Sequence, residues 1–373
     1  MKKLLLALVA VLLCVAVVSC GGSNDEKKRG TSVEGSNPNY KVAMITDYGD
    51  ITDQSFNQST FEGAYDWCEK NDVSFRYYKP VSNSDADRIA STNKAIEEGH
   101  NVIVMPGYAF GPTIAEVADK NPTVKFIALD VSEFDISGGA EGFVLPSNVY
   151  CAVYQEELCG FMAGYAAVKE GYTKLGFLGG MAVPAVQRYG YGFVQGCNAA
   201  AGNAKIEINY VYGGQFYGDA DITNAMQVWY NGGTEVVFAC GGGIYTSACE
   251  AAGEKGKVIG VDVDQSGTIA AQYGDMCITS AMKGLYATVD ATLTNVLAGK
   301  FESKVETLGL VSGTDVEKNY VQLPTATWSM KKFTLNDYKA LVKDLFDGKI
   351  TVSNDTTVAV STFANVKDQG SIK

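Results

Sequence analysis

The sequence predicts an α/β protein built from two doubly wound lobes, and three observations support this prediction. From residue 40 onward, short apolar runs alternate with helix-period segments, which is typical of βαβ units and parallel sheets. Several runs, such as Val102-Ile103-Val104-Met105, are continuously apolar, as expected of strands covered on both faces. The alternation breaks once, between Ser132 and Tyr150, and then restarts. We therefore expect two sheets and not one.

Each expected strand is a short apolar run that ends in a Gly-rich or polar turn, and each expected helix follows such a turn. The expected strands cover residues 41–46, 74–78, 101–105, 124–129, 175–178, 206–212, 235–239, 257–261 and 277–280. The expected helices cover residues 55–69, 85–98, 112–119, 155–169, 184–201, 221–230, 244–254, 283–298 and 336–346.

The beginning of the chain carries export signals. Two lysines precede an apolar run over residues 4–18, which is shorter than the ~20 residues that a bilayer-spanning helix needs. Residues 1–19 therefore predict a signal peptide. The small residues before Cys20 resemble a bacterial lipobox, so we expect this cysteine to be acylated, with a palmitate-type chain; ordinary cleavage near Ser19 is the alternative. Residues 20–39 predict a flexible tether, which would hold the protein at the extracytoplasmic face of the cell membrane by its lipid anchor alone.

Charge and composition exclude several classes of function. A formal net charge of −12, without a basic stripe, does not offer the clustered Lys and Arg that nucleic-acid binding needs. The single histidine, His100, removes most Ser-His-Asp and Cys-His chemistry. The cysteines show no C-x-x-C spacing, so neither a zinc site nor a reactive dithiol is expected. We expect no metal, no cofactor and no nucleic-acid partner.

Residues at the carboxyl ends of the expected strands are the candidate site residues, because open α/β sheets bind ligands there. Asp47 follows the first expected strand and Asp130 the fourth. Gly242 lies in a Gly-rich turn after the seventh, where its backbone is expected to line the cleft. Lys283, at a strand-to-helix junction, is either an ordinary exposed lysine or a donor to a ligand oxygen.

Two carboxylates near the eighth expected strand admit several roles. Asp262 and Asp264 are two residues apart, so we expect them on one strand face. Such a pair could bind a metal, act as acid and base, or accept hydrogen bonds from vicinal hydroxyls.

Two phenylalanines are candidates for stacking on a planar ligand. Phe56 lies in the first turn of the first expected helix, where it either packs between helix and sheet or projects into the cleft. Phe216 lies in a loop bounded by glycines that offers no helix to pack beneath. We expect its ring to face solvent until a ligand stacks on it.

Four motifs are more specific together than alone. They are D-x-G-x-x-x-D-x-S-F-N at residues 47–57, R-x-G-x-G-F-x-x-G-C at 188–197, V-I-G-V-D-V-D-Q at 258–265 and S-x-x-K at 280–283. With the lipobox, they resemble the basic membrane protein family of ABC transporter substrate-binding lipoproteins. The resemblance implies a type I periplasmic-binding-protein fold, in which three hinge strands join two Rossmann-like lobes. We assign residues 40–147 and 265–305 to the first lobe and residues 148–264 and 306–373 to the second.

The resemblance also implies a function. The chain would be a receptor without enzymatic activity. Its ligand would be a purine nucleoside of the inosine, guanosine or adenosine class. The receptor would close by hinge bending and deliver its ligand to an ABC permease and ATPase. Phe56 and Phe216 would sandwich the purine, and Asp130 would bond its edge. The ribose or flanking groups would be held by Asp47, Asn57, Asp262 and Lys283. The alternatives are a sugar or autoinducer receptor of the same fold, and a nucleoside hydrolase with calcium at Asp262 and Asp264.

Overall fold

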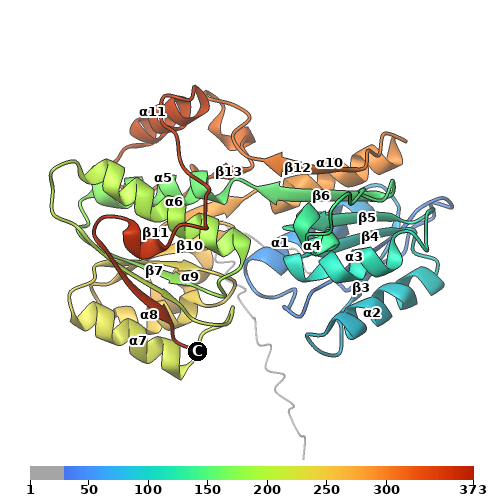
Figure 1. Ribbon diagram of the computed structural model, residues 1–373, viewed down its shortest axis with the longest axis horizontal. Coiled ribbons are helices and arrows are strands. Elements are labelled where there is room, and N and C mark those ends of the chain that lie inside the picture. Colours follow the sequence, from blue (N-terminus) through green and yellow to red (C-terminus); the bar gives the residue numbers. More distant parts are fainter. Residues whose placement is uncertain (1–28) are drawn as a thin grey trace, which may run out of the picture. The chain divides into compact units, whose positions relative to one another are not determined.

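The computed structural model describes residues 29–373 of the chain. Residues Thr31–Lys373 form one structural unit, in which two seven-stranded sheets are flanked by helices (Figure 1). The predicted α/β class with two sheets is therefore confirmed. The predicted signal peptide and the lipidated Cys20 lie outside the described residues.

The first lobe is built on a sheet whose strands are parallel except for β1. In spatial order the sheet contains β1 (Ser32–Val33), β3 (Ser74–Tyr78), β2 (Lys41–Ile45), β4 (Val102–Pro106), β5 (Lys125–Leu129), β6 (Val149–Tyr154) and β12 (Lys304–Leu308). Its helices are α1 (Phe56–Lys70), α2 (Asp85–Glu97), α3 (Gly111–Val117), α4 (Glu133–Ser137) and α10 (Leu285–Leu297), the last of which packs on α1.

The second lobe is built on a sheet in which only β13 runs antiparallel to its neighbour, among the described strands. In spatial order the sheet contains β13 (Val321–Gln322), β11 (Cys277–Lys283), β10 (Lys257–Asp262), β9 (Val236–Cys240), β7 (Lys174–Gly179), β8 (Glu207–Tyr212) and β14 (Val366–Ser371). Its helices are α5 (Glu156–Glu170), α6 (Pro184–Ala201), α7 (Ala220–Asn231), α8 (Tyr245–Ala252), α9 (Ser266–Tyr273) and α11 (Leu335–Phe346). No helix within residues 29–373 has both the length and the apolarity to cross a bilayer.

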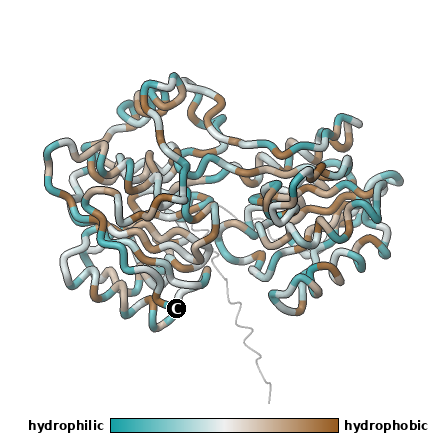
Figure 2. Tube along the Cα trace, viewed as in Figure 1, coloured by the Kyte–Doolittle hydropathy of each residue, from teal (hydrophilic) through white to brown (hydrophobic). Residues whose placement is uncertain are grey.

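Both faces of the sheets are buried, as the continuously apolar runs predict. In β4, Val102 and Val104 pack into one apolar cluster, while Ile103 and Met105 pack into another on the opposite face. All four side chains are buried. Apolar residues are concentrated on the strands of both sheets, which are mostly brown in Figure 2. This arrangement is the one that parallel sheets require, because helices cover both faces.

The chain passes between the two sheets three times: from β6 to α5, from β11 to α10 and from β12 to β13. These passages are hydrogen-bonded to one another. The N–H of Gln155 donates to the C=O of Leu308 at 2.9 Å, and the N–H of Gly284 donates to the C=O of Tyr320 at 2.7 Å. The three-strand hinge that the resemblance implies is therefore present.

The predicted lobe boundaries are partly wrong. The prediction assigns residues from 148 onward to the second lobe, but β6 pairs with β5 in the first sheet. It assigns residues 265–305 to the first lobe, but β11 pairs with β10 in the second sheet, and the boundary after residue 305 would cut β12. Parallel strands pair with partners that are distant in sequence, so local periodicity locates a strand without identifying its sheet.

Part of the predicted flexible tether is fixed to the first lobe. The strand β1 pairs with β3, so the chain is held from Ser32 onward. The N–H of Asn37 donates to the C=O of Asp72 at 3.0 Å, and the N–H of Gly35 donates to the hydroxyl of Ser74 at 3.2 Å. These contacts are made by backbone and polar groups. Because apolar periodicity does not report such contacts, the sequence of residues 20–39 could not predict that this segment is held.

Candidate functional site

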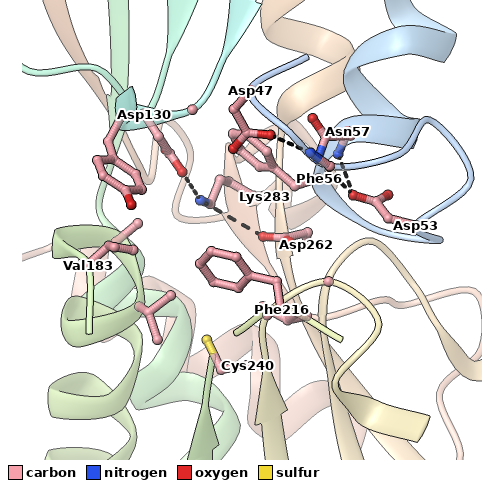
Figure 3. Close-up of a pocket in the computed structure, with 18 of the residues that line it drawn as sticks. Asp47, Asp53, Phe56, Asn57, Asp130, Val183, Phe216, Cys240, Asp262 and Lys283 are labelled. Carbon is pink, nitrogen blue, oxygen red and sulfur yellow. Dashed lines mark hydrogen bonds and ion pairs between the residues drawn. The ribbon is translucent and has the colours of Figure 1, made fainter. Parts of the chain in front are cut away.

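A cavity of about 460 Å³ lies between the carboxyl ends of the strands of the two sheets (Figure 3). In each sheet the strand order reverses at this point, next to β2 in the first sheet and next to β7 in the second. Such switch points are where open α/β sheets bind ligands. The residues predicted from the sequence all line this cavity: Asp47, Phe56, Asn57, Asp130, Phe216, Gly242, Asp262 and Lys283. Their role in binding stays a prediction.

Asp47 is a fixed hydrogen-bond acceptor at the end of β2. Its Oδ1 accepts the N–H groups of Tyr48 at 2.6 Å and of Gly49 at 2.8 Å. Burial raises the pKa of this carboxyl, while the two N–H donors oppose that rise. The loop after β2 therefore holds the carboxylate in one orientation before any ligand arrives.

The start of α1 is capped by Asp53. Its carboxylate accepts the N–H groups of Ser55 at 2.9 Å, Asn57 at 2.9 Å and Gln58 at 3.0 Å, which a helix leaves free in its first turn. Burial raises the pKa of Asp53 to about 6. Because Asp53 supplies the cap, the hydroxyl of Ser55 is free to donate to Asp262 Oδ2 at 2.6 Å.

The first two residues of α1 face the cavity in different ways. Phe56 is half-buried: its ring packs partly against the core and also lines the cavity, so both readings of this residue are partly right. The amide of Asn57 donates to Asp53 at 3.1 Å. The Oδ1 of Asn57 is buried and has no hydrogen-bond partner. It is therefore an acceptor available to a ligand.

Lys283 is the charged centre of the site. Its ammonium lies 2.7 Å from Asp130 Oδ2 and 3.9 Å from Asp262 Oδ1 (Figure 3). It also lies 3.2 Å from Glu156 Oε1. The rings of Phe56, Tyr154 and Tyr189 surround it, with centroids at 5.1, 5.3 and 5.5 Å. Burial lowers the pKa of this ammonium, but Asp130, Glu156 and Asp262 raise it by more. Lys283 is thus a charged, buried lysine and not an exposed one.

Asp130 and Asp262 occupy equivalent places in the two lobes. Asp130 directly follows β5, and Asp262 is the last residue of β10. Both residues have a left-handed backbone, with φ of 57° at Asp130 and 63° at Asp262. Such a conformation costs of order 1–3 kcal/mol for a residue other than glycine, and it is typical of functional sites. Burial raises the pKa of Asp130 to about 6 even though Lys283 lowers it, and Asp130 Oδ1 has no partner. Burial also raises the pKa of Asp262.

The expectation that Asp262 and Asp264 share a strand face is wrong. The strand ends at Asp262, and the positive φ there breaks the alternation of side chains. Asp262 lines the cavity, whereas Asp264 accepts from the N–H of Ser266 at 3.1 Å and from the hydroxyl of Thr327 at 2.6 Å. Among residues 29–373, no group of three or more His, Cys, Asp or Glu side chains could hold a metal ion.

Phe216 enters the cavity on the loop between β8 and α7. Its carbonyl accepts the N–H of Gly243 at 2.8 Å. A Cβ on Gly180 would lie 2.3 Å from Phe216 Cδ1, so only glycine leaves room for the ring there. Gly242 has a φ of +51°, and a Cβ on it would lie 2.7 Å from the Phe216 carbonyl oxygen. The ring is half-buried instead of freely solvent-facing, because these glycines let it settle against the backbone.

Several charged residues at the site were not predicted, and Glu156 and Arg188 are the two that join the ion-pair network of Lys283. Glu156, at the start of α5, is fully buried and accepts from Arg188 Nε at 2.6 Å. Burial lowers the pKa of Arg188, but Glu156, Asp130 and Glu157 together raise it by more. A signal existed for both: Arg188 opens one of the quoted motifs, and Glu156 begins an otherwise apolar helix directly after the first hinge passage.

The cavity carries more acidic than basic groups. The carboxylates among its lining residues are Asp47, Asp50, Asp53, Asp130, Asp135 and Asp262. The lining cations are each paired: Lys79 with Asp50 at 2.7 Å, Arg188 with Glu156 at 2.6 Å and Lys283 with Asp130 at 2.7 Å. An anionic ligand would therefore meet no unpaired cation among the described lining residues. A neutral ligand rich in O–H and N–H donors suits this lining better.

The sequence matches a family model described as ABC transporter substrate-binding protein, PnrA-like, over residues 40–340. The ABC transporter nucleoside-binding protein BmpA of Lactococcus lactis subsp. cremoris is 29% identical to this chain, over 94% of this chain and 99% of that protein. The CD4+ T-cell-stimulating antigen of Listeria innocua is 30% identical, also over 94% of this chain and 99% of that protein.

Solved structures share the fold. An ABC transporter solute-binding protein from Aeropyrum pernix superposes with a TM-score of 0.64 at 20% sequence identity, over 85% of this chain and 88% of that chain. A solute-binding protein from Conexibacter woesei also superposes with a TM-score of 0.64, at 22% identity, over 84% of this chain and 99% of that chain. At such identities the likeness shows the architecture and not the ligand.

Proposed function

This chain belongs to the PnrA-like family of ABC transporter substrate-binding proteins, and from that premise we propose that it binds a purine nucleoside between its two lobes. The family to which the motifs pointed is thereby confirmed. Its members are binding components of transporters, so the chain is not an enzyme and the nucleoside hydrolase alternative is rejected.

The observation that carries the proposal is the pair of phenylalanines in one cavity. Phe56 comes from the first lobe and Phe216 from the second, and both rings are half-buried at the cavity wall (Figure 3). A flat base between two such rings gains roughly 1–3 kcal/mol per stacking contact. A relative of similar length is named a nucleoside-binding protein, which agrees with this choice of ligand.

The polar lining suits the rest of a nucleoside. Asn57 Oδ1 and Asp130 Oδ1 are buried acceptors that lack a donor, and leaving such atoms unpaired costs free energy. A purine edge brings N–H donors for Asp130, and a ribose brings hydroxyl donors. The groups that we assign to the ribose are Asp47, Asn57, Asp262 and Lys283.

Closure of the lobes would couple binding to transport. Contacts already link the lobes beside the cavity: the Ser55 hydroxyl donates to Asp262 at 2.6 Å, and Gln265 Nε2 donates to the Gln54 carbonyl at 3.1 Å. A ligand that touches both lobes favours the closed arrangement by its difference in affinity for the two states. The closed, loaded protein would then be the form that an ABC permease and its ATPase recognise.

We assign the membrane attachment to a lipid on Cys20. Two or more acyl chains, at ~0.8 kcal/mol per buried methylene, would hold the protein on the extracytoplasmic face of the membrane. Radiolabelled palmitate should label the wild-type protein but not the Cys20→Ala variant. Equal labelling of both proteins would overturn the assignment.

Isothermal titration calorimetry tests the ligand directly. The panel contains inosine, guanosine, adenosine, cytidine, free hypoxanthine and ribose. Purine nucleosides should bind more tightly than free hypoxanthine, because the ribose contacts add to stacking, and ribose alone should bind weakly. Tight binding of ribose or another sugar without any nucleoside binding would replace this proposal with the sugar-receptor alternative.

A further inference from the structure

The strand β14 lies next to the loop that carries Phe216, and it falls outside residues 40–340, which the family model matches. It is the red strand that leads to the C label in Figure 1, at the edge of the second sheet. It runs parallel to β8, with Val366 opposite Ile208 and Ser371 opposite Tyr212. The chain leaves β8 directly into residues 213–219, which we call the Phe216 loop.

The residues after β14 touch the backbone of the Phe216 loop. The N–H of Ile372 donates to the C=O of Tyr212 at 2.8 Å, at the point where β8 ends. Gly214 has a φ of +82°, and a Cβ there would lie 2.9 Å from Lys373 Cβ. Only a glycine therefore allows the loop to approach Lys373 this closely.

Lys373 also joins the two sides of the loop. Its ammonium forms an ion pair with Asp219 and donates a hydrogen bond to Gln215 Oε1 at 3.2 Å. Gln215 Nε2 in turn donates to Asp219 Oδ2 at 2.7 Å and to the Tyr217 carbonyl at 3.0 Å. Gln215 and Asp219 lie on either side of Phe216 in the sequence, so these bonds connect the two ends of the Phe216 loop.

We propose that residues 371–373 act as a brace that positions Phe216 for ligand stacking, with Lys373 as a positioning residue. The inference rests on the proposed function for its link to the ligand, since it assigns Phe216 to the stacking surface. A loop that is ordered before binding loses less conformational entropy when the ligand arrives. Loss of the brace should therefore weaken binding without changing any group that touches the ligand.

The experiment compares three variants of the full chain. Lys373→Ala removes the ammonium, and Lys373→Arg keeps a cation that can pair with Asp219. Lys367→Ala is the matched control, because Lys367 forms an exposed ion pair with Glu207 at 2.7 Å, between β14 and β8, away from the loop. Hydrogen exchange of residues 213–219 is measured without ligand, and inosine and guanosine affinities are measured by calorimetry.

We expect residues 213–219 to exchange about two- to fivefold faster in Lys373→Ala, the range typical of one exposed charge pair. The Kd for inosine or guanosine should rise by about the same factor. Lys373→Arg should restore both quantities, and Lys367→Ala should change neither. Equal exchange in Lys373→Ala and Lys367→Ala would overturn the brace.

The two arms separate this inference from the proposed function. Faster exchange with unchanged nucleoside affinity would overturn the role in ligand positioning. If the wild-type protein binds no nucleoside, the proposed function and this role fail together, while the exchange arm still decides whether Lys373 holds the loop.

Discussion

The ammonium of Lys283, at the end of β11 in the second lobe, lies 2.7 Å from the carboxylate of Asp130, which follows β5 in the first lobe. This ion pair crosses between the lobes inside the cavity, and Glu156 and Asp262 flank it. The side chain of Lys283 is only 2% exposed. Its charge therefore neutralises carboxylates that are largely buried.

Replacing Lys283 by methionine should destabilise the protein by about 3–5 kcal/mol, because it leaves buried carboxylates without their counter-ion. The free energy of unfolding in urea measures the effect. Lys318→Met is the matched control: Lys318 also lies 2.7 Å from a carboxylate, that of Asp315, but both side chains are exposed. That substitution should cost about 1 kcal/mol or less. Similar losses in the two variants would contradict the role assigned to Lys283.

Removing either stacking ring should weaken nucleoside binding. Phe56→Ala and Phe216→Ala should each cost roughly 1–3 kcal/mol of binding free energy, and the double variant should bind no purine nucleoside measurably. Phe346→Ala is the control, since Phe346 lies on α11 with 47% of its surface exposed. Calorimetry measures the affinity of all four variants, and of the wild type, for inosine. Wild-type affinity in the double variant would show that the base does not lie between these rings.

Asp53 should position the start of α1 as well as stabilise it. Asp53→Ala removes the acceptor of three N–H groups and should cost about 0.5–2 kcal/mol of stability. It should also weaken nucleoside binding, because Phe56 and Asn57 follow it directly. Ser84→Ala removes the cap of α2, where Ser84 accepts the Asp87 N–H at 3.2 Å, and should lower stability alone. Equal nucleoside affinities of Asp53→Ala and Ser84→Ala would mean that Asp53 only caps the helix.

The stability of the protein should fall as pH rises through the range where Glu157 titrates. Burial raises the pKa of Glu157 from its ordinary 4.5 to about 7, and its Oε2 has no partner. The folded state therefore holds this proton more tightly than the unfolded state. The stabilisation is complete below about pH 4.5 and is lost as pH rises to about 7.

Glu157→Gln should flatten this part of the stability profile by up to about 3 kcal/mol. Unfolding in urea at several pH values between 4.5 and 8 measures the slope. Glu97→Gln, on the exposed side of α2, should leave the slope as it is in the wild type. A Glu157→Gln profile as steep as that of the wild type would mean that another group titrates.

Much of the architecture follows from local patterning. The strand expected at residues 101–105 is found at Val102–Pro106, and that expected at 41–46 is found at Lys41–Ile45. The eight candidate site residues meet at one cavity because parallel strands present their carboxyl ends at the same edge of a sheet. For most of these features the order of apolar runs and turns is sufficient information, whereas Asn57 was named only through the family resemblance.

Other features depend on partners that are distant along the chain. The pairing of β11 with β10, and of β6 with β5, decided which sheet each strand joins. The environment of Lys283 combines side chains from β11, α5 and the ends of β5 and β10, so no motif could reveal how many carboxylates surround it. Side-chain periodicity indicates which residues are buried. Long-range strand pairing and the burial of charges depend on contacts that form only in the folded tertiary structure.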